Sequence, residues 1–460
     1  MPPVQVQPAL TPTAPVPPQP PTPNKKWLYM GLVFIGALVV AGGAVFAAQK
    51  MLTMQPQSDS GEGSLVKEPA CDPNDPKVTE NVKLKGTYTY DTIEQGSHTF
   101  RVISAGLDSD NLWIHEKPWD VCGLPAVLVQ TLKDGKDKPA HIIWNGNTYE
   151  VPADAEPLPM VHHQLAFKEG YFGKGVVDGK EYDFSDVISK AFSVQGSGAI
   201  IEAAPGSFAD RSDNATVNVV YKGQTFGPYV DVIPPIVSVN GEPTYFASDG
   251  GRKFKLYTSG REVSAPGVSG VPPSEYSLVD YKGQPAYILG SGREYTAYIG
   301  TKPQPQFGNA LAVYSVGGSL VTTSMVGEEY HLFIDGKDVG VGSSVYDSDG
   351  VVGYLSGRSE DGQYSIMRGN KVVGSIDKPS VFYPTRSSYN GSWGDFTFIG
   401  DTPAYVYRGG YTGNSYTEQY VGYGNEKLFN GFSVDFVANI GGKLVVKAQM
   451  DRTDYVFIEE

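Results

Sequence analysis

The sequence predicts an all-β chain assembled from repeated four-stranded units, and three observations support this fold class. Short runs of β-branched and aromatic residues alternate with Gly-containing turns from about residue 120 to the end of the chain. Gly (55 residues) and Tyr (29 residues) are abundant, whereas only 19% of the residues are charged. This composition is typical of many short strands joined by tight turns. The same hairpin pattern also recurs along the chain, which indicates a repeat architecture.

The clearest unit is residues 276–300, YSLVDYKGQPAYILGSGREYTAYIG. Three strand-like runs are separated by Lys282-Gly283 and by the polar loop 290–294, and the third run closes at Gly300. A two-residue hairpin turn requires positive φ angles, which Gly adopts without a steric clash. The unit therefore reads as two consecutive hairpins.

Two series of turns repeat this unit. One joins the first strand to the second, at Gly123, Asn240-Gly241, Lys282-Gly283, Gly317-Gly318, Asp349-Gly350, Gly400-Asp401 and Gly441-Gly442. The other closes the third strand, with glycines at 146, 179, 223, 260, 300, 336, 369 and 424, spaced 33 to 55 residues apart. A period of roughly 40 residues with four strands per unit is typical of a β-propeller blade. We therefore predict a β-propeller of seven or eight four-stranded blades. A β-sandwich or a string of small β domains is the alternative, but the strands of a sandwich would not repeat one motif in register.

The end of the chain suggests how the propeller closes. Residues 455–458 form a third strand with no turn after them, so an open ring would leave an unpaired strand edge. A strand from residues 86–104 is expected to fill this place and make a composite blade.

The N-terminal part predicts a membrane anchor. Residues 1–24 are Pro-rich and uncharged, as in a disordered tail. Residues 27–48 lack charge and would span about 30 Å as a helix. Lys25 and Lys26 precede this stretch, and Trp27 and Tyr29 suit the membrane interface. We predict a cytoplasmic tail (1–24), one transmembrane signal-anchor helix (25–50), a flexible linker (51–85) and the propeller domain (86–460).

Charge around this helix predicts its orientation. Two lysines flank its N-terminal side and Lys50 alone its C-terminal side, which places residues 1–24 inside and residues 49–460 outside the cytoplasmic membrane. A cleaved signal peptide is the alternative. Small residues four apart, such as Ala37 and Ala41, could support a homodimer through the helix. The partners expected are membrane lipid and an envelope protein or glycan.

Charge and motifs limit the possible functions. The net charge is −14 and no long Lys/Arg cluster occurs, which argues against a nucleic-acid partner. Phosphate-binding, zinc-protease and C-x-x-C motifs are absent from the sequence, so no cofactor or metal is expected. The adjacent pair His162-His163 would point to opposite faces of a strand, so it does not suit a single metal. Asp347–Gly350 and Asp108–Asn111 resemble the start of a calcium loop but fit turn chemistry better.

The sequence contains two cysteines, Cys71 and Cys122. In an exported domain paired cysteines usually form a disulfide. A bridge between them would fix the linker to the first blade, and two unrelated thiols are the alternative.

Residues 248–262 (SDGGRKFKLYTSGRE), 329–340 (EYHLFIDGKDVG) and 359–374 (SEDGQYSIMRGNKVVG) resemble propeller repeats of the TolB-like kind and, more loosely, WD repeats. The resemblance implies a propeller that binds proteins or small ligands across one face; no catalytic residues follow from it. We expect a membrane-anchored binding or scaffold module of the cell envelope. The alternative is a carbohydrate-active propeller enzyme, a glycan hydrolase or lyase, which would need converging carboxylates.

Overall fold

A computed structural model describes residues 71–106, 112–114, 117–131, 140–170, 173–184, 190–204, 216–250, 253–273, 276–291, 294–357, 363–377, 396–411 and 416–460. The predicted tail (1–24), anchor helix (25–50) and membrane-interface residues Lys25, Lys26, Trp27 and Tyr29 lie outside them. Within the described ranges, no helix is long and apolar enough to cross a bilayer. The helices there are two 3-10 turns, η1 (Pro76–Thr79) and η2 (Pro305–Phe307).

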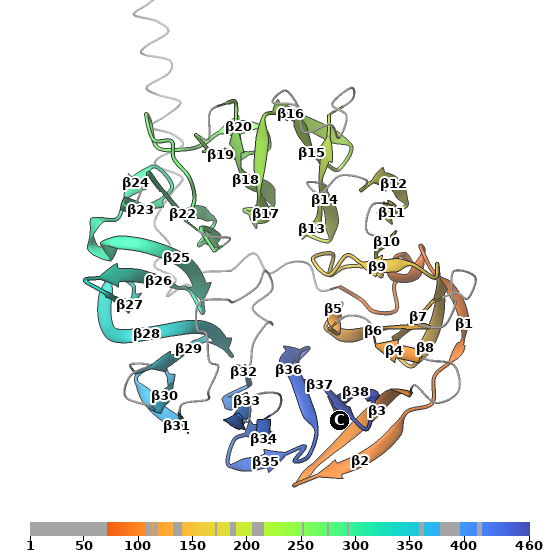
Figure 1. Cartoon of the computed structure of the whole chain (residues 1–460). Coiled ribbons are helices and arrows are strands. Elements are labelled where there is room, and N and C mark those ends of the chain that lie inside the picture. Colours follow the sequence, from red (N-terminus) through yellow and green to blue (C-terminus); the bar gives the residue numbers. More distant parts are fainter. Residues whose placement is uncertain are drawn as a thin grey trace, which may run out of the picture. The chain divides into compact units, whose positions relative to one another are not determined.

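The described chain is all-β, and its strands form eight antiparallel sheets (Figure 1). The first sheet contains β1 (Lys83–Thr87), β4 (Leu112–Ile114), β5 (Trp119–Val121), β6 (Leu124–Thr131), β7 (Ala140–Trp144) and β8 (Asn147–Val151). The next three contain β9 (Ala155–Pro157), β10 (Phe167–Glu169), β11 (Lys174–Val177) and β12 (Lys180–Asp183); β13 (Lys190–Val194), β14 (Ser197–Ala203), β15 (Val217–Tyr221) and β16 (Gln224–Tyr229); and β17 (Asp231–Val239), β18 (Glu242–Ser248), β19 (Lys255–Thr258) and β20 (Arg261–Glu262).

The remaining sheets continue the same meander order. The fifth contains β21 (Leu278–Tyr281), β22 (Gln284–Ser291), β23 (Glu294–Ile299) and β24 (Lys302–Pro303). The sixth contains β25 (Asn309–Val316), β26 (Ser319–Val326), β27 (Glu329–Ile334), β28 (Lys337–Ser348), β29 (Val351–Ser356), β30 (Gln363–Arg368) and β31 (Lys371–Asp377). The last two contain β32 (Phe396–Ile399), β33 (Thr402–Tyr411), β34 (Tyr416–Tyr423) and β35 (Glu426–Leu428); and β36 (Ser433–Ile440), β37 (Lys443–Met450), β38 (Thr453–Glu459), β3 (His98–Gly106) and β2 (Asp91–Gln95).

The hydrophobic core lies between successive sheets. In β22, Ala286 and Ile288 belong to the cluster shared with β25–β27, whereas Tyr287 and Leu289 belong to the cluster shared with β18 and β19. The middle of this strand is therefore buried on both faces, because a neighbouring sheet packs on each side. Similar clusters follow one another along the chain, and the last sheet packs against the first through Ile103, Val127 and other residues. This closed succession of meanders is a β-propeller.

Closure by the N-terminal strand is confirmed. β3 pairs with β38 from Phe100↔Glu459 to Gly106↔Thr453, and Figure 1 shows β2 and β3 beside β38. Strands from the two ends of the described chain thus share one sheet, which removes the free edge that an unclosed ring would expose.

The number of meanders depends on how one long strand pairs with its neighbours. The twelve-residue strand β28 pairs with β27 through its first half and with β29 through its second half, so the seven-stranded sheet holds two meanders. The described residues therefore contain nine meanders: seven have four strands, the first sheet has six strands and the closing sheet has five. The second turn series underestimates this number because the closing sheet takes its fourth strand from the N-terminus, where no such turn occurs.

The predicted linker, 51–85, extends too far. Residues 71–85 belong to the domain: Val78 in η1 is only 2% exposed, and β1 pairs with β8 from Lys83 onward. The Pro, Asp and Asn residues of this stretch form capped turns, such as the Asp75 carboxylate accepting from the Lys77 backbone N–H at 2.9 Å. They are turn formers, which composition alone does not distinguish from linker residues.

The connections of the meanders divide into two faces. Consecutive turns of an antiparallel meander alternate between its two ends, so first-to-second and third-to-fourth connections lie on one face, here called the turn face. Neighbouring sheets have their first-to-second turns on the same face, because glycines of these turns lie next to each other. A Cβ added to Gly441 would meet the Gly123 carbonyl, and one added to Gly317 would meet the Gly350 carbonyl. Connections on the turn face are two-residue turns, except for segment 158–166 between β9 and β10. On the opposite loop face, the connections that the structure describes in full range from Val230 alone and the two-residue turn 327–328 to residues 304–308.

Candidate functional site

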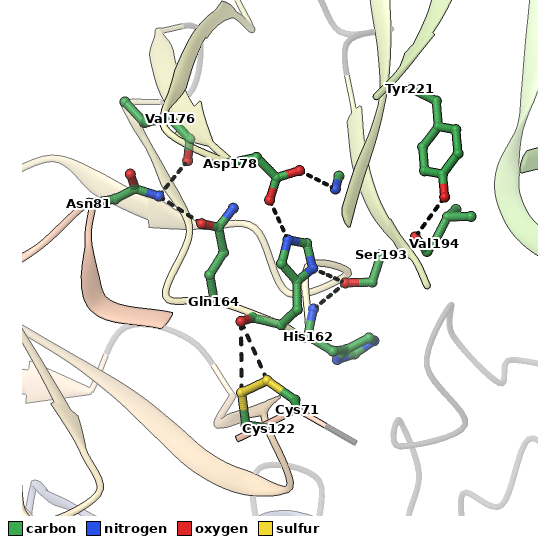
Figure 2. Close-up of polar contacts among 12 residues, drawn as sticks. Cys71, Asn81, Cys122, His162, Gln164, Val176, Asp178, Ser193, Val194 and Tyr221 are labelled. Carbon is green, nitrogen blue, oxygen red and sulfur yellow. Dashed lines mark hydrogen bonds and ion pairs between the residues drawn. A yellow bond between two sulfur atoms is a disulfide. The ribbon is translucent and has the colours of Figure 1, made fainter. Parts of the chain in front are cut away.

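The exceptional connection on the turn face, residues 158–166, lies at the centre of a polar network that joins several sheets (Figure 2). It contains both histidines singled out in the sequence. Strands of the first three sheets and the first described residues of the chain, 71–82, surround it. We call this arrangement, residues 71–82 and 158–166 with Asp120, Cys122, Asp178 and Ser193, the N-terminal socket.

The two cysteines meet in the socket. Cys71 and Cys122 are joined by a disulfide across 51 sequence positions (Figure 2). Cys122 occupies the β5–β6 turn with a φ of 53°, and its backbone N–H donates to the His162 carbonyl at 2.8 Å. The His163 carbonyl oxygen lies 3.5 Å from the Cys71 Sγ and 3.7 Å from the Cys122 Sγ. A disulfide sulfur has no proton, so these two approaches are contacts; a thiol in either position would be able to donate to the carbonyl.

The side chain of His163 connects two sheets. Its Nε2 lies 2.8 Å from Asp178 Oδ1, and its Nδ1 lies 2.7 Å from Ser193 Oγ. Asp178 follows β11 and Ser193 is on β13, so the ring joins the second sheet to the third. Asp178 Oδ2 also accepts from the Gly198 backbone N–H at 2.6 Å. With Asp178 ionised, Nε2–H donates to the carboxylate and Nδ1 accepts from the Ser193 hydroxyl.

This Ser–His–Asp chain differs from a hydrolytic triad. In such triads the serine bonds to Nε2 and the aspartate to Nδ1, whereas here the two ring nitrogens are exchanged. The Ser193 oxygen also accepts the His162 backbone N–H at 2.8 Å. The hydroxyl is thus engaged by two framework groups, and the arrangement acts as a tie between sheets.

The two histidines have different partners, so their rings are directed toward different sheets. The His162 Nδ1 faces the Asp120 carbonyl at 3.1 Å, on the first sheet, whereas His163 faces the second and third. Both residues lie in an irregular segment and not on the strand that the sequence suggested. Their rings nevertheless diverge as expected.

Two carboxyl groups of the socket have shifted pKa values in opposite directions. Burial raises the pKa of Asp120, partly offset by His162 and by the Gly123 N–H. For Asp178, burial acts to raise the pKa, but hydrogen bonds from His163 and Gly198 outweigh it and lower the pKa. Asp178 therefore favours the ionised form that accepts both bonds.

Residues 71–82 are held to the socket by further contacts. The Leu165 N–H donates to the Val78 carbonyl at 2.7 Å. Asn81 Nδ2 donates to Gln164 Oε1 at 3.0 Å and to the Val176 carbonyl at 3.3 Å. Val78 is buried together with Trp119, Val121 and Leu165. The N-terminal end of the described chain is thus docked on the turn face.

Other features noted in the sequence have local structural roles. Asp347 Oδ1 accepts the Gly350 N–H at 2.7 Å, as in a capped turn, whereas 108–111 lies outside the described residues. Asp435 and Asp454 are two carboxylates that interact electrostatically. Burial raises the pKa of Asp435, Lys447 acts to lower it, and the charge of Asp454 acts to raise it. Asp454 accepts from the Ile114 N–H at 3.2 Å and from Gln449 Nε2 at 3.0 Å, so it joins the last sheet to the first.

Sequence reasoning found the cysteines and the histidine pair but missed Asp120, Asp178 and Ser193. Asp178 directly precedes Gly179, one of the turn glycines, and the sequence indicates only a turn role for it. A turn aspartate with a free carboxylate gave no sign that it would meet a histidine from another connection.

Comparisons with known proteins do not identify a family. No protein-family model matches the chain, and no curated protein matches it. Among solved structures, a complex of BBS1N with ARL6DN soaked with lead shares 10% identity over 82% of this chain and 98% of that one, with a TM-score of 0.28. The propeller domain of the trilobed protease from Pyrococcus furiosus shares 9% identity over 75% and 95%, with a TM-score of 0.27. An acylaminoacyl peptidase bound to a chloromethyl ketone shares 12% over 74% and 60%, with a TM-score of 0.28. Such low scores carry no argument about function, and the assignment of the fold rests on the sheets themselves.

Proposed function

We propose that the chain is a membrane-anchored, extracytoplasmic propeller of nine blades that acts as a binding or scaffold module of the cell envelope. The apolar stretch 27–48, flanked by Lys25 and Lys26, supports the anchor, and the TolB-like repeats support a ligand-binding role. The nine meanders support the number of blades.

One observation supports the proposal most directly: the two faces of the propeller differ in their connections. The chain enters the domain on the turn face, where the socket holds residues 71–82 and two-residue turns make up the other described connections. The loop-face connections that are described in full differ in length, from one to five residues. Binding residues are often located on loops that a rigid scaffold positions. In a protein tethered through its N-terminal side, the loop face would be left accessible to a partner.

The test is a binding screen that blocks one face at a time. The full chain in nanodiscs is presented to envelope glycans and envelope proteins. Because the sequence has no cysteine besides Cys71 and Cys122, a new cysteine can be labelled selectively with a bulky polyethylene-glycol maleimide. Glu328→Cys places the label on the loop face in the β26–β27 turn, and Lys222→Cys places it on the turn face in the β15–β16 turn; both side chains are exposed.

We expect the label at position 328 to weaken ligand binding at least tenfold and the label at 222 to leave it within about twofold. Unlabelled variants serve as controls for the substitutions. Loss of binding from position 222 alone would contradict the proposal. Hydrolysis or elimination of a glycan by the unlabelled chain would favour the enzyme alternative.

A further inference from the structure

The disulfide encloses the strands that close the propeller. The 51-position loop between Cys71 and Cys122 contains η1 and β1 to β5. Two of these strands, β2 and β3, belong to the closing sheet with β36–β38, whereas the others belong to the first sheet or lie beside it. The two bonded cysteines therefore flank the closing strands in the sequence, one on each side.

We propose that the Cys71–Cys122 disulfide is a redox-sensitive lock on the closure of the propeller. Without the bond, the chain that precedes β3 would be held only by noncovalent contacts. Going back from β3, these include the pairing of β2 with β3 and the pairing of β1 with β8. A chain that leaves β38 from this side can peel away progressively. With the bond, both ends of segment 72–121 are fixed at the socket, so a released β3 stays close to β38 and pairs again quickly, as an intramolecular partner at high effective concentration.

The closing sheet offers several contacts for this lock to protect. β3 pairs with β38 over seven residues. At the edge of the sheet, Ser97 donates to Glu426 through its N–H at 2.9 Å and its hydroxyl at 2.6 Å. His98 Nδ1 lies 2.9 Å from Glu459 Oε1. These groups are partly exposed and would be lost first if the strand peeled away from its N-terminal side.

The socket fits both redox states of the cysteines. The His163 carbonyl is within 3.7 Å of both sulfurs, so it would accept a hydrogen bond from either thiol after reduction. Cys122 is also held by its own N–H bond to the His162 carbonyl. Opening the bond would leave residues 71–82 held to the socket by noncovalent contacts alone, without removing the partners of the β5–β6 turn. This reversibility is what a lock requires.

The opening step is a thiol–disulfide exchange with an external dithiol. A thiolate of the dithiol attacks one sulfur, the Cys71–Cys122 bond breaks, and a mixed disulfide forms. The second thiol of the dithiol then displaces the cysteine sulfur. The protein gains two electrons and two protons as two thiols, and the dithiol becomes a cyclic disulfide.

The test is hydrogen–deuterium exchange on the full chain in detergent, before and after treatment of the folded protein with dithiothreitol. We expect amides of β2 and β3 to exchange at least tenfold faster after reduction, while those of β22 and β23 change less than twofold. Cys71→Ser/Cys122→Ser should reproduce the reduced pattern without reductant. If this variant does not fold, the dithiothreitol arm decides alone.

Two outcomes would overturn the proposal. An equal increase in β22 and β23, or no increase in β2 and β3, would show that the bond does not act on the closure. Alkylation of two cysteines in the unreduced protein, measured by intact mass, would show that there is no lock to open. None of these readouts depends on the membrane or on a ligand, so the proposal and the proposed function can fail separately.

Discussion

Truncation of Phe100 tests whether the N-terminal strand is an integral part of the core. Phe100 on β3 is fully buried, and its ring centroid lies 5.0 Å from that of Phe429 in an edge-to-face arrangement. It packs in the cluster that joins the closing sheet to β32–β35. Phe100→Ala would leave a cavity, and such substitutions cost about 3–5 kcal/mol in the free energy of unfolding. With an unfolding entropy of about 2.1 cal/mol/K per residue, a domain spanning 71–460 would lose about 4–6 °C in Tm.

Differential scanning calorimetry at a fixed scan rate measures this shift, since propellers of this size can unfold irreversibly. Phe246→Ala, in the cluster between β18–β19 and β21–β22, is the matched core variant from an interface without N-terminal strands. Arg101→Ala, next to Phe100 on the same strand, removes an exposed ion pair with Glu460 that is worth about 0–1 kcal/mol. A Phe100→Ala shift no larger than that of Arg101→Ala, with a full shift for Phe246→Ala, would refute the integral closure.

Three further predictions address the socket, the turn face and the anchor. The lowered pKa of Asp178 means that its ionised form contributes stability above its ordinary pKa of about 3.9 and that this contribution disappears as the pH falls through the folded value. Asp178→Asn should therefore flatten the acid limb of a Tm-against-pH curve, and an unchanged limb would contradict the tie to His163. Gly317→Ala should lower the Tm by several degrees, because its φ is 54° and its Cβ would meet the Gly350 carbonyl; Gly283→Ala, at φ 74° with no atom within 4 Å, controls for backbone strain, and equal shifts would argue against contact between the turns. Protease added to intact spheroplasts should remove the β domain and leave a small membrane stub; full protection of residues 49–460 would reverse the orientation, and a soluble protein beginning near Ala48 would identify a signal peptide.

The sequence by itself determined the hairpins, because their causes are local. Lys282-Gly283 adopts φ angles of 54° and 74°, as the turn chemistry predicts, and the Asp280 carboxylate accepts the Gly283 N–H at 2.8 Å. The alternating and doubly buried runs around such turns indicate strands with a packed sheet on each side.

Only the tertiary structure decided the site, because its groups are brought together by packing between different blades. His163, Asp178 and Ser193 come from three separate connections and strands, and no periodicity relates them. The cysteines were visible in the sequence, but their proximity depends on residues 71–82 docking against 158–166. That docking follows from the burial of Val78 among Trp119, Val121 and Leu165. The composition of a Pro- and Asp-rich stretch does not reveal such a nonlocal hydrophobic contact, because the surface that buries Val78 forms only in the folded protein.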